Sequence, residues 1–137
     1  MTIIADTGAL YALADTDDRW HKRVVDWWRS NVVPIVVPVT VLPEVTYLLA
    51  TRIGPEGEES FVQAVAEGEF TTEPLEQEDV VRAADLLRQY ADLPLGFVDA
   101  TVAATAERLR SRTLLTTDRR HFSVVRPKVA RRYELVP

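Results

Sequence analysis

Four acidic residues of this chain come from distant segments, yet each has the context expected at one edge of a parallel α/β sheet. Asp6 and Asp118 each follow a short apolar run, as a residue does where a buried strand ends. Glu44 and Asp99 each stand early in an apolar stretch that we expect to be helical. Ligands of open α/β sheets bind outside the carboxyl ends of the strands, beside the N-termini of the helices that follow. The four carboxylates are therefore expected to converge on one site.

Converging carboxylates are typical of a metal site. Oxygen ligands suit Mg²⁺ or Mn²⁺, and Mg²⁺ keeps several waters while taking one or two protein carboxylates directly. Four acids thus fit one or two such ions, with some acids acting through water. Two unit charges 5 Å apart repel by about 3 kcal/mol at an effective dielectric constant near 20, so the cluster needs cations. Its expected use is to position a metal, activate a water and assist in-line displacement at phosphorus.

Each acid taken alone has a structural alternative. Asp6 can cap a helix that begins at Thr7, and Glu44 and Asp99 can complement the dipoles of the helices in which they lie. Asp99, however, lies in the segment Gly96-Phe97-Val98-Asp99-Ala100, whose apolar residues predict partial burial. A buried carboxylate needs a partner. The four positions together favour the metal site.

The segments that must position these residues alternate between strands and helices. We expect strands at Thr2–Ala5, Ile35–Val37, Glu69–Thr72, Thr113–Thr116 and, at the end of the chain, Arg132–Val136. We expect helices at Thr7–Asp15, Arg19–Ser30, Thr40–Ile53, Glu58–Glu67, Glu76–Tyr90 and Val98–Arg110, with a break at Gly54–Gly57. This alternation predicts a mostly parallel sheet that is covered by helices on both faces. No repeat or linker divides residues 1–137, so we expect a single domain.

The composition narrows the class of protein. A chain of 137 residues with 47% hydrophobic and 27% charged residues is ordinary for a soluble globular domain. The absence of cysteine excludes disulfides, zinc–thiolate sites and thiol nucleophiles, and it agrees with the cytoplasm as the place of action. The most apolar stretch, residues 32–50, contains three prolines and Glu44, so it is a poor membrane span.

Charge is unevenly distributed along the chain. The net charge is −5, but residues 1–107 carry 7 Lys/Arg against 19 Asp/Glu, whereas residues 108–137 carry 9 against 2. A basic C-terminal part of this kind is expected to attract phosphate. The alternative is a solvated basic tail.

The chain resembles the PIN-domain ribonucleases, and most closely the VapC-type toxins of toxin–antitoxin pairs. The matching segments, in chain order, are Ile4-Ala5-Asp6-Thr7-Gly8-Ala9-Leu10, Pro43-Glu44-Val45, Leu95-Gly96-Phe97-Val98-Asp99-Ala100 and Leu114-Leu115-Thr116-Thr117-Asp118-Arg119-Arg120-His121-Phe122. The resemblance implies a three-layer α/β/α sandwich. It also matches Asp6, Glu44, Asp99 and Asp118 to the family's acidic quartet around Mg²⁺ or Mn²⁺, and Thr116 to a frequent hydroxyl neighbour.

The resemblance further implies a cytoplasmic endoribonuclease that pairs with an antitoxin protein and forms a homodimer. In the mechanism that we expect, Asp6 and Asp99 contact the metal most directly, and Glu44 and Asp118 complete the shell or hold water. Thr116 lies on the same side of its strand as Asp118 and is expected to support the site, although it can equally cap main chain.

The residues that follow the last acid have less certain functions. Arg119 and Arg120 are expected to hold RNA phosphates, with ion pairs to nearby acids as the equal alternative. His121 is predicted to be a loop or capping residue rather than a general base. The stripe of Trp20, Trp27 and Trp28 has helical spacing, so these side chains are expected to lie in the core and at its rim on one face of a single helix. The second interpretation is a protein–protein surface.

Other families with acidic sites fit less well. A phosphorelay receiver domain needs an adjacent acidic pair after the first strand and a late lysine, whereas Asp6 stands alone and the only late lysine, Lys128, follows Pro127. A haloacid-dehalogenase-type phosphatase needs a second acid two residues after the first, where this chain has Gly8. A non-catalytic RNA- or protein-binding PIN module remains the main alternative to a nuclease.

Overall fold

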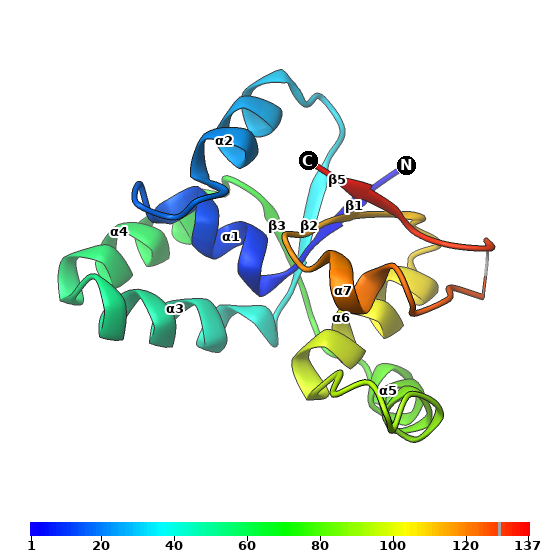
Figure 1. The fold of residues 1–137 in the computed structure, drawn as a ribbon. Coiled ribbons are helices and arrows are strands. Elements are labelled where there is room, and N and C mark those ends of the chain that lie inside the picture. Colours follow the sequence, from blue (N-terminus) through cyan, green and yellow to red (C-terminus); the bar gives the residue numbers. More distant parts are fainter. Residues whose placement is uncertain (129) are drawn as a thin grey trace.

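A computed structural model describes residues 1–128 and 130–137, and its centre is one five-stranded sheet between two layers of helices (Figure 1). The strands are β1 (Ile3–Ala5), β2 (Ile35–Pro38), β3 (Thr71–Glu73), β4 (Thr113–Leu115) and β5 (Glu134–Val136). Their order in the sheet is β3-β2-β1-β4-β5, and all four neighbouring pairs are parallel. The predicted α/β/α sandwich is confirmed.

The helices form one group on each side of this sheet. They are α1 (Thr7–Ala14), α2 (His21–Ser30), α3 (Val41–Arg52), α4 (Pro55–Ala66), α5 (Gln77–Gln89), α6 (Phe97–Arg108) and α7 (Arg119–Phe122). In Figure 1, α1 to α4 form the group on the left, and α5 to α7 form the group at the lower right, below β5. Helices α5 and α6 pack on each other, and α6 also contacts β1 and β2.

The core holds the central strands in register. Every residue of β1, β2 and β4 is buried, as is an almost continuous run of small residues along α6. Burying each large aliphatic side chain stabilises the fold by about 1.5–3 kcal/mol. Because Ala5 pairs with Leu115, the chain leaves β1 and β4 at the same edge of the sheet.

The winding of the sheet changes direction at that edge. The chain proceeds from β1 outward to β2 and β3, and then returns to place β4 on the other side of β1. The boundary between β1 and β4 is therefore the point where the winding direction reverses, which is where open α/β sheets bind their ligands. Asp6 and Asp118 follow the two strands that flank it.

Several element boundaries differ from the sequence predictions, and the starts of three elements illustrate the causes. Helix α4 begins at Pro55 rather than Glu58, because Gly54 adopts φ 136° and Pro55 starts the first turn, so the expected break is instead a helix start. Helix α2 begins at His21 rather than Arg19, because the Asp18 carboxylate accepts a bond from the Trp20 N–H (2.8 Å) in a preceding turn. Strand β3 begins two residues later than expected, at Thr71.

The single turn α7 is an addition to the predicted elements. It has four residues, which is too few to show a periodic apolar pattern. None of the described helices is both long and apolar enough to cross a membrane.

Candidate metal centre

Asp6 is held at the junction of β1 and α1. It caps α1, with Oδ1 accepting a bond from the Ala9 N–H (2.9 Å), and Oδ2 accepts a bond from the Thr116 hydroxyl. The residue is only 2% exposed. Burial raises the pKa of Asp6 to about 6; the two hydrogen bonds oppose this rise, and the charges of Asp118 and Glu44 add to it. Asp6 thus caps α1 and also belongs to the acidic cluster, so the structural and the functional interpretation of this residue are compatible.

Thr116 connects the ends of the two central strands. Its buried hydroxyl donates to Asp6 and accepts a bond from the Asp118 N–H (2.8 Å). One side chain therefore fixes the carboxylate that follows β1 relative to the main chain that follows β4. The structure places Thr116 between the two acids, where a supporting residue would have to lie.

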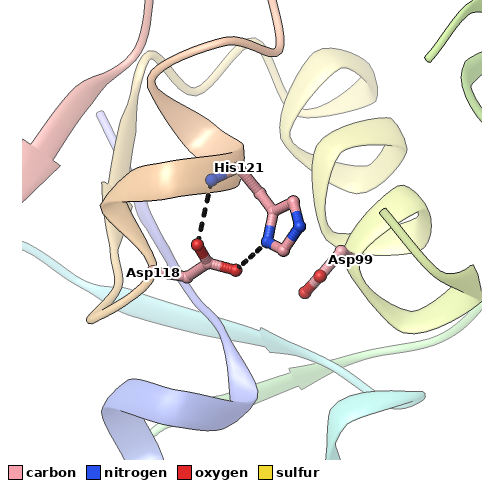
Figure 2. Close-up of side chains that lie close together, drawn as sticks. All are labelled: Asp99, Asp118 and His121. Carbon is pink, nitrogen blue, oxygen red and sulfur yellow. Dashed lines mark hydrogen bonds and ion pairs between the residues drawn. The ribbon is translucent and has the colours of Figure 1, made fainter. Parts of the chain in front are cut away.

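Asp118 caps α7 and is clamped by one neighbour. Its Oδ1 accepts a bond from the main-chain N–H of His121 (2.9 Å), and its Oδ2 lies 2.5 Å from Nδ1 of the same histidine. Figure 2 shows both contacts. An ionised carboxylate can only accept hydrogen bonds, so His121 Nδ1 is the donor.

Asp99 is a half-buried acid that has no hydrogen-bond partner among the described residues. It lies in the first turn of α6, and no hydrogen bond to its carboxylate comes from residues 1–128 or 130–137. Burial raises the pKa of Asp99 to about 8, and the charges of Asp6, Asp118 and Glu44 each contribute to the rise. One ligand atom from each of Asp99, Asp118 and His121 lies within 4.8 Å of the others, and Figure 2 shows the Asp99 carboxylate near the imidazole.

Glu44 is the exposed member of the group. It stands in the first turn of α3, and its charge raises the pKa of both Asp6 and Asp99. It therefore lies close enough to repel them while remaining open to solvent. The structure thus brings together all four acids that the sequence singled out, from the ends of β1 and β4 and the starts of α3 and α6.

This donor set fits a hard divalent cation. Carboxylate oxygens are the preferred protein ligands of Mg²⁺ and Mn²⁺. The half-buried, partly desolvated Asp99 carboxylate has no hydrogen-bond partner in the described part of the chain, although a desolvated acid needs one. A cation among the four acids would supply that partner and reduce their mutual repulsion. The residues present are therefore those expected of a Mg²⁺ or Mn²⁺ site.

The two arginines of α7 differ in their contacts. The guanidinium of Arg119 donates to the main-chain oxygen of Pro137 (2.6 Å) and lies 5.8 Å from the centre of the Trp20 ring. Arg120 is exposed, and the ion pairs among the described residues do not include it. The alternative interpretation, ion pairs with nearby acids, is thus not observed for either arginine in the part of the chain that the structure describes.

The tryptophan stripe is less buried than a core stripe would be. Val24 of α2 is fully buried, whereas Trp27 and Trp28 of the same helix are half-buried against the core. Trp20 stacks against Arg23, whose guanidinium lies 4.2 Å from the ring centre. The stripe is thus mainly the rim of α2.

His121, predicted from sequence to be a loop or capping residue, also contacts the site through its side chain. Its spacing of three from Asp118 predicts the main-chain capping bond that is observed. The contact of the imidazole with the other carboxylate oxygen depends on the side-chain conformation, which the spacing alone does not determine.

Comparison with known proteins agrees with this geometry. The family model described as "PIN domain" matches residues 3–127. This chain belongs to the PIN-domain family. Ribonuclease VapC26 of Mycobacterium tuberculosis is 35% identical to it over 135 residues, which are 98% of this chain and 100% of that protein. The PIN domain is therefore of the VapC type, and the receiver and phosphatase alternatives are set aside.

Solved structures share the PIN fold at lower identity. The crystal structure of M. tuberculosis VapC20, described as a sarcin–ricin loop cleaving toxin, has a TM-score of 0.81 and 21% identity, covering 86% of this chain and 91% of that one. A toxin–antitoxin complex from Klebsiella pneumoniae has a TM-score of 0.70 and 20% identity, covering 90% and 92%. These likenesses establish the fold.

Proposed function

We propose that this PIN-domain protein is a divalent-cation-dependent endoribonuclease and the toxin of a toxin–antitoxin pair. The observation that carries the proposal is Asp99, a carboxylate without a hydrogen-bond donor whose pKa is raised by burial and by three neighbouring acids. It lies in a chain that is 35% identical to a protein named a ribonuclease over almost its full length. A non-catalytic module would have no need to maintain such repulsion.

The residues of the site divide the work between them. When bound, Mg²⁺ or Mn²⁺ supplies an activated water and neutralises charge that develops at phosphorus. Asp99 and Asp118 would hold the cation together with Asp6, which Thr116 keeps fixed. Glu44, at the exposed rim, would orient water or a second ion. Arg120 would contact a phosphate of the RNA beside the cleaved bond.

A cleavage assay with purified protein tests this function. The wild type should cut RNA with Mg²⁺ or Mn²⁺ and not with EDTA. Asp6→Asn and Asp99→Asn should each lower the rate by about 100-fold or more, because a neutral amide is a poor ligand and loss of the metal's effect is worth several kcal/mol. Glu59→Gln, an exposed acid of α4, is the matched control. RNA binding without cleavage by the wild type would favour the non-catalytic module.

The antitoxin proposal is supported by an apolar cavity whose lining includes none of the four acids. It has a volume of about 510 Å³ and lies between α1, α2 and α4, with Leu10, Trp28, Phe61 and Phe70 among its walls. Structures with this fold include VapBC2 of Rickettsia felis bound to promoter DNA and the Klebsiella complex. We propose that an apolar segment of the antitoxin fills the cavity, which would use part of the tryptophan stripe as a protein–protein surface.

Coexpression with the neighbouring small gene tests this partner. The two proteins should copurify, and the toxicity of the free protein should disappear. Ala64→Arg, which puts a charge into the cavity, should prevent copurification without altering RNA cleavage by the free protein. Ala66→Arg on the exposed side of the same helix should have no effect. Copurification that survives Ala64→Arg would place the partner elsewhere.

The remaining proposals concern assembly and location. We propose that the free protein is a homodimer and acts on RNA in the cytoplasm. Light scattering of the purified protein should give the mass of two chains, and the mass of a single chain of 15.4 kDa would contradict the dimer.

A further inference from the structure

His121 contacts the acidic site through two separate atoms. Its main-chain N–H and its imidazole Nδ1 each bond to a different oxygen of Asp118, at 2.9 and 2.5 Å. The main-chain bond is a helix cap that any residue except proline could donate. The imidazole bond is made by the side chain, so a substitution at position 121 can remove it while the main-chain bond remains.

The imidazole bond removes the remaining freedom of the Asp118 carboxylate. With the main-chain bond alone, the carboxylate could turn about its Cβ–Cγ bond and direct its second oxygen elsewhere. With both oxygens engaged by one residue, its plane is fixed relative to α7 (Figure 2). Each ionised oxygen still has a lone pair to offer. One of these oxygens lies within 4.8 Å of a carboxylate oxygen of Asp99.

The other ring nitrogen indicates that His121 is not present merely to fill space. Nε2 is buried and has no hydrogen-bond partner among the described residues. A buried polar atom without a partner destabilises a fold, and an apolar side chain of similar size would fill the same volume without that cost. The unsatisfied Nε2 thus belongs to a residue whose Nδ1 bonds to Asp118, one of the acids of the site.

We propose that His121 is a positioning residue, whose Nδ1–H holds the Asp118 carboxylate in the orientation in which it and Asp99 bind a divalent cation. The inference rests on the proposed function for the identity of the ligand. Partners that orient a ligating carboxylate in this way typically change metal affinity by 10–100-fold when they are removed. His121 would therefore set the affinity of the site without touching the cation.

Two substitutions separate the δ nitrogen from the rest of the ring. His121→Leu removes the donor while keeping an apolar side chain of similar size. His121→Asn keeps an N–H donor at the δ position and removes Nε2. Mn²⁺ affinity, measured by isothermal titration calorimetry, should fall about 10–100-fold in His121→Leu and largely recover in His121→Asn. His21→Leu, at the chain's other histidine, whose Nδ1 contacts the Ala12 carbonyl, should leave affinity unchanged.

Two further readouts test the same hydrogen bond without RNA. Long-range ¹H–¹⁵N NMR of the metal-free protein should show a proton on His121 Nδ1, and the melting temperature of His121→Leu in EDTA should not fall. Equal Mn²⁺ affinity in wild type and His121→Leu would overturn the proposal. It would also fall if His121→Asn bound as weakly as His121→Leu, or if ¹⁴N coupling appeared in the Mn²⁺ EPR spectrum, which would make His121 a ligand itself.

The outcome is separable from that of the nuclease proposal. If the wild type binds Mn²⁺ with the expected differences between variants but leaves RNA intact, the positioning role stands and the nuclease proposal fails. If the wild type cleaves RNA and the variants bind Mn²⁺ with equal affinity, the nuclease proposal stands and the positioning role fails. A wild type that binds no Mn²⁺ contradicts both.

Discussion

Individual acids of this site perform a structural and a chemical task at once. Asp6 and Asp118 each cap a helix with one oxygen, and the other oxygen accepts a bond from a neighbouring side chain, Thr116 for Asp6 and His121 for Asp118. A sequence pattern shows where a cap is needed, and so it correctly located both residues. The pattern could not show which carboxylate oxygen accepts which hydrogen bond. That depends on the side-chain rotamers of Thr116 and His121, which bring their donors to the two carboxylates.

Asp99 offers a prediction at the scale of one residue. Its pKa is raised from 3.8 to about 8 in the folded, metal-free protein. A raised folded-state pKa contributes stability below the unfolded pKa, and this contribution is lost as pH rises through about 8. Asp99→Asn does not titrate, so in EDTA its stability advantage over wild type should grow between pH 5 and pH 8 to an order of 2 kcal/mol.

Urea unfolding at several pH values measures this difference. Asp92→Asn, an exposed acid in the turn before α6, is the matched control and should follow the wild type throughout. If Asp99→Asn followed the wild type equally well, the Asp99 carboxylate would not be desolvated and repelled as the structure indicates.

At the scale of elements, α7 is what the sequence predicted least well. Longer helices such as α3, α5 and α6 can be predicted from the spacing of their apolar residues. A helix of one turn is too short to show a periodic apolar pattern. The pattern of α7 suggested two equivalent arginines. In the structure, Arg119 is engaged by Pro137 and Trp20, and Arg120 projects into solvent.

This asymmetry within α7 predicts different consequences for the two arginines. Arg120→Gln should weaken RNA binding and lower the slope of log K against log salt by about 0.7, the value for one phosphate contact to single-stranded RNA. Arg119→Gln should mainly lower the melting temperature. Arg112→Gln, at the other end of β4, controls for the loss of one exposed charge. Equal slopes for Arg120→Gln and Arg112→Gln would remove Arg120 from the RNA surface.

At the scale of the whole molecule, four segments that span residues 6 to 118 meet because of the strand order. Alternating strands and helices predicted the parallel sheet, and the rule that ligands bind at carboxyl ends predicted the edge. The order β3-β2-β1-β4-β5 is set by which apolar faces pack together, and local periodicity does not contain that information. The acids and Thr116 could thus be assigned to one edge from sequence, but the contact of the His121 imidazole with Asp118 could not.

Metal-induced stabilisation tests most directly whether these acids form one cation site. A ligand that binds only the folded state stabilises it by about 2.7 kcal/mol at 100 times its dissociation constant. The melting temperature of the wild type should therefore rise steadily as Mn²⁺ replaces EDTA. Asp99→Asn, more stable than the wild type in EDTA, should lose most of this gain. A wild-type melting temperature that is the same in EDTA and in excess Mn²⁺ would contradict the account.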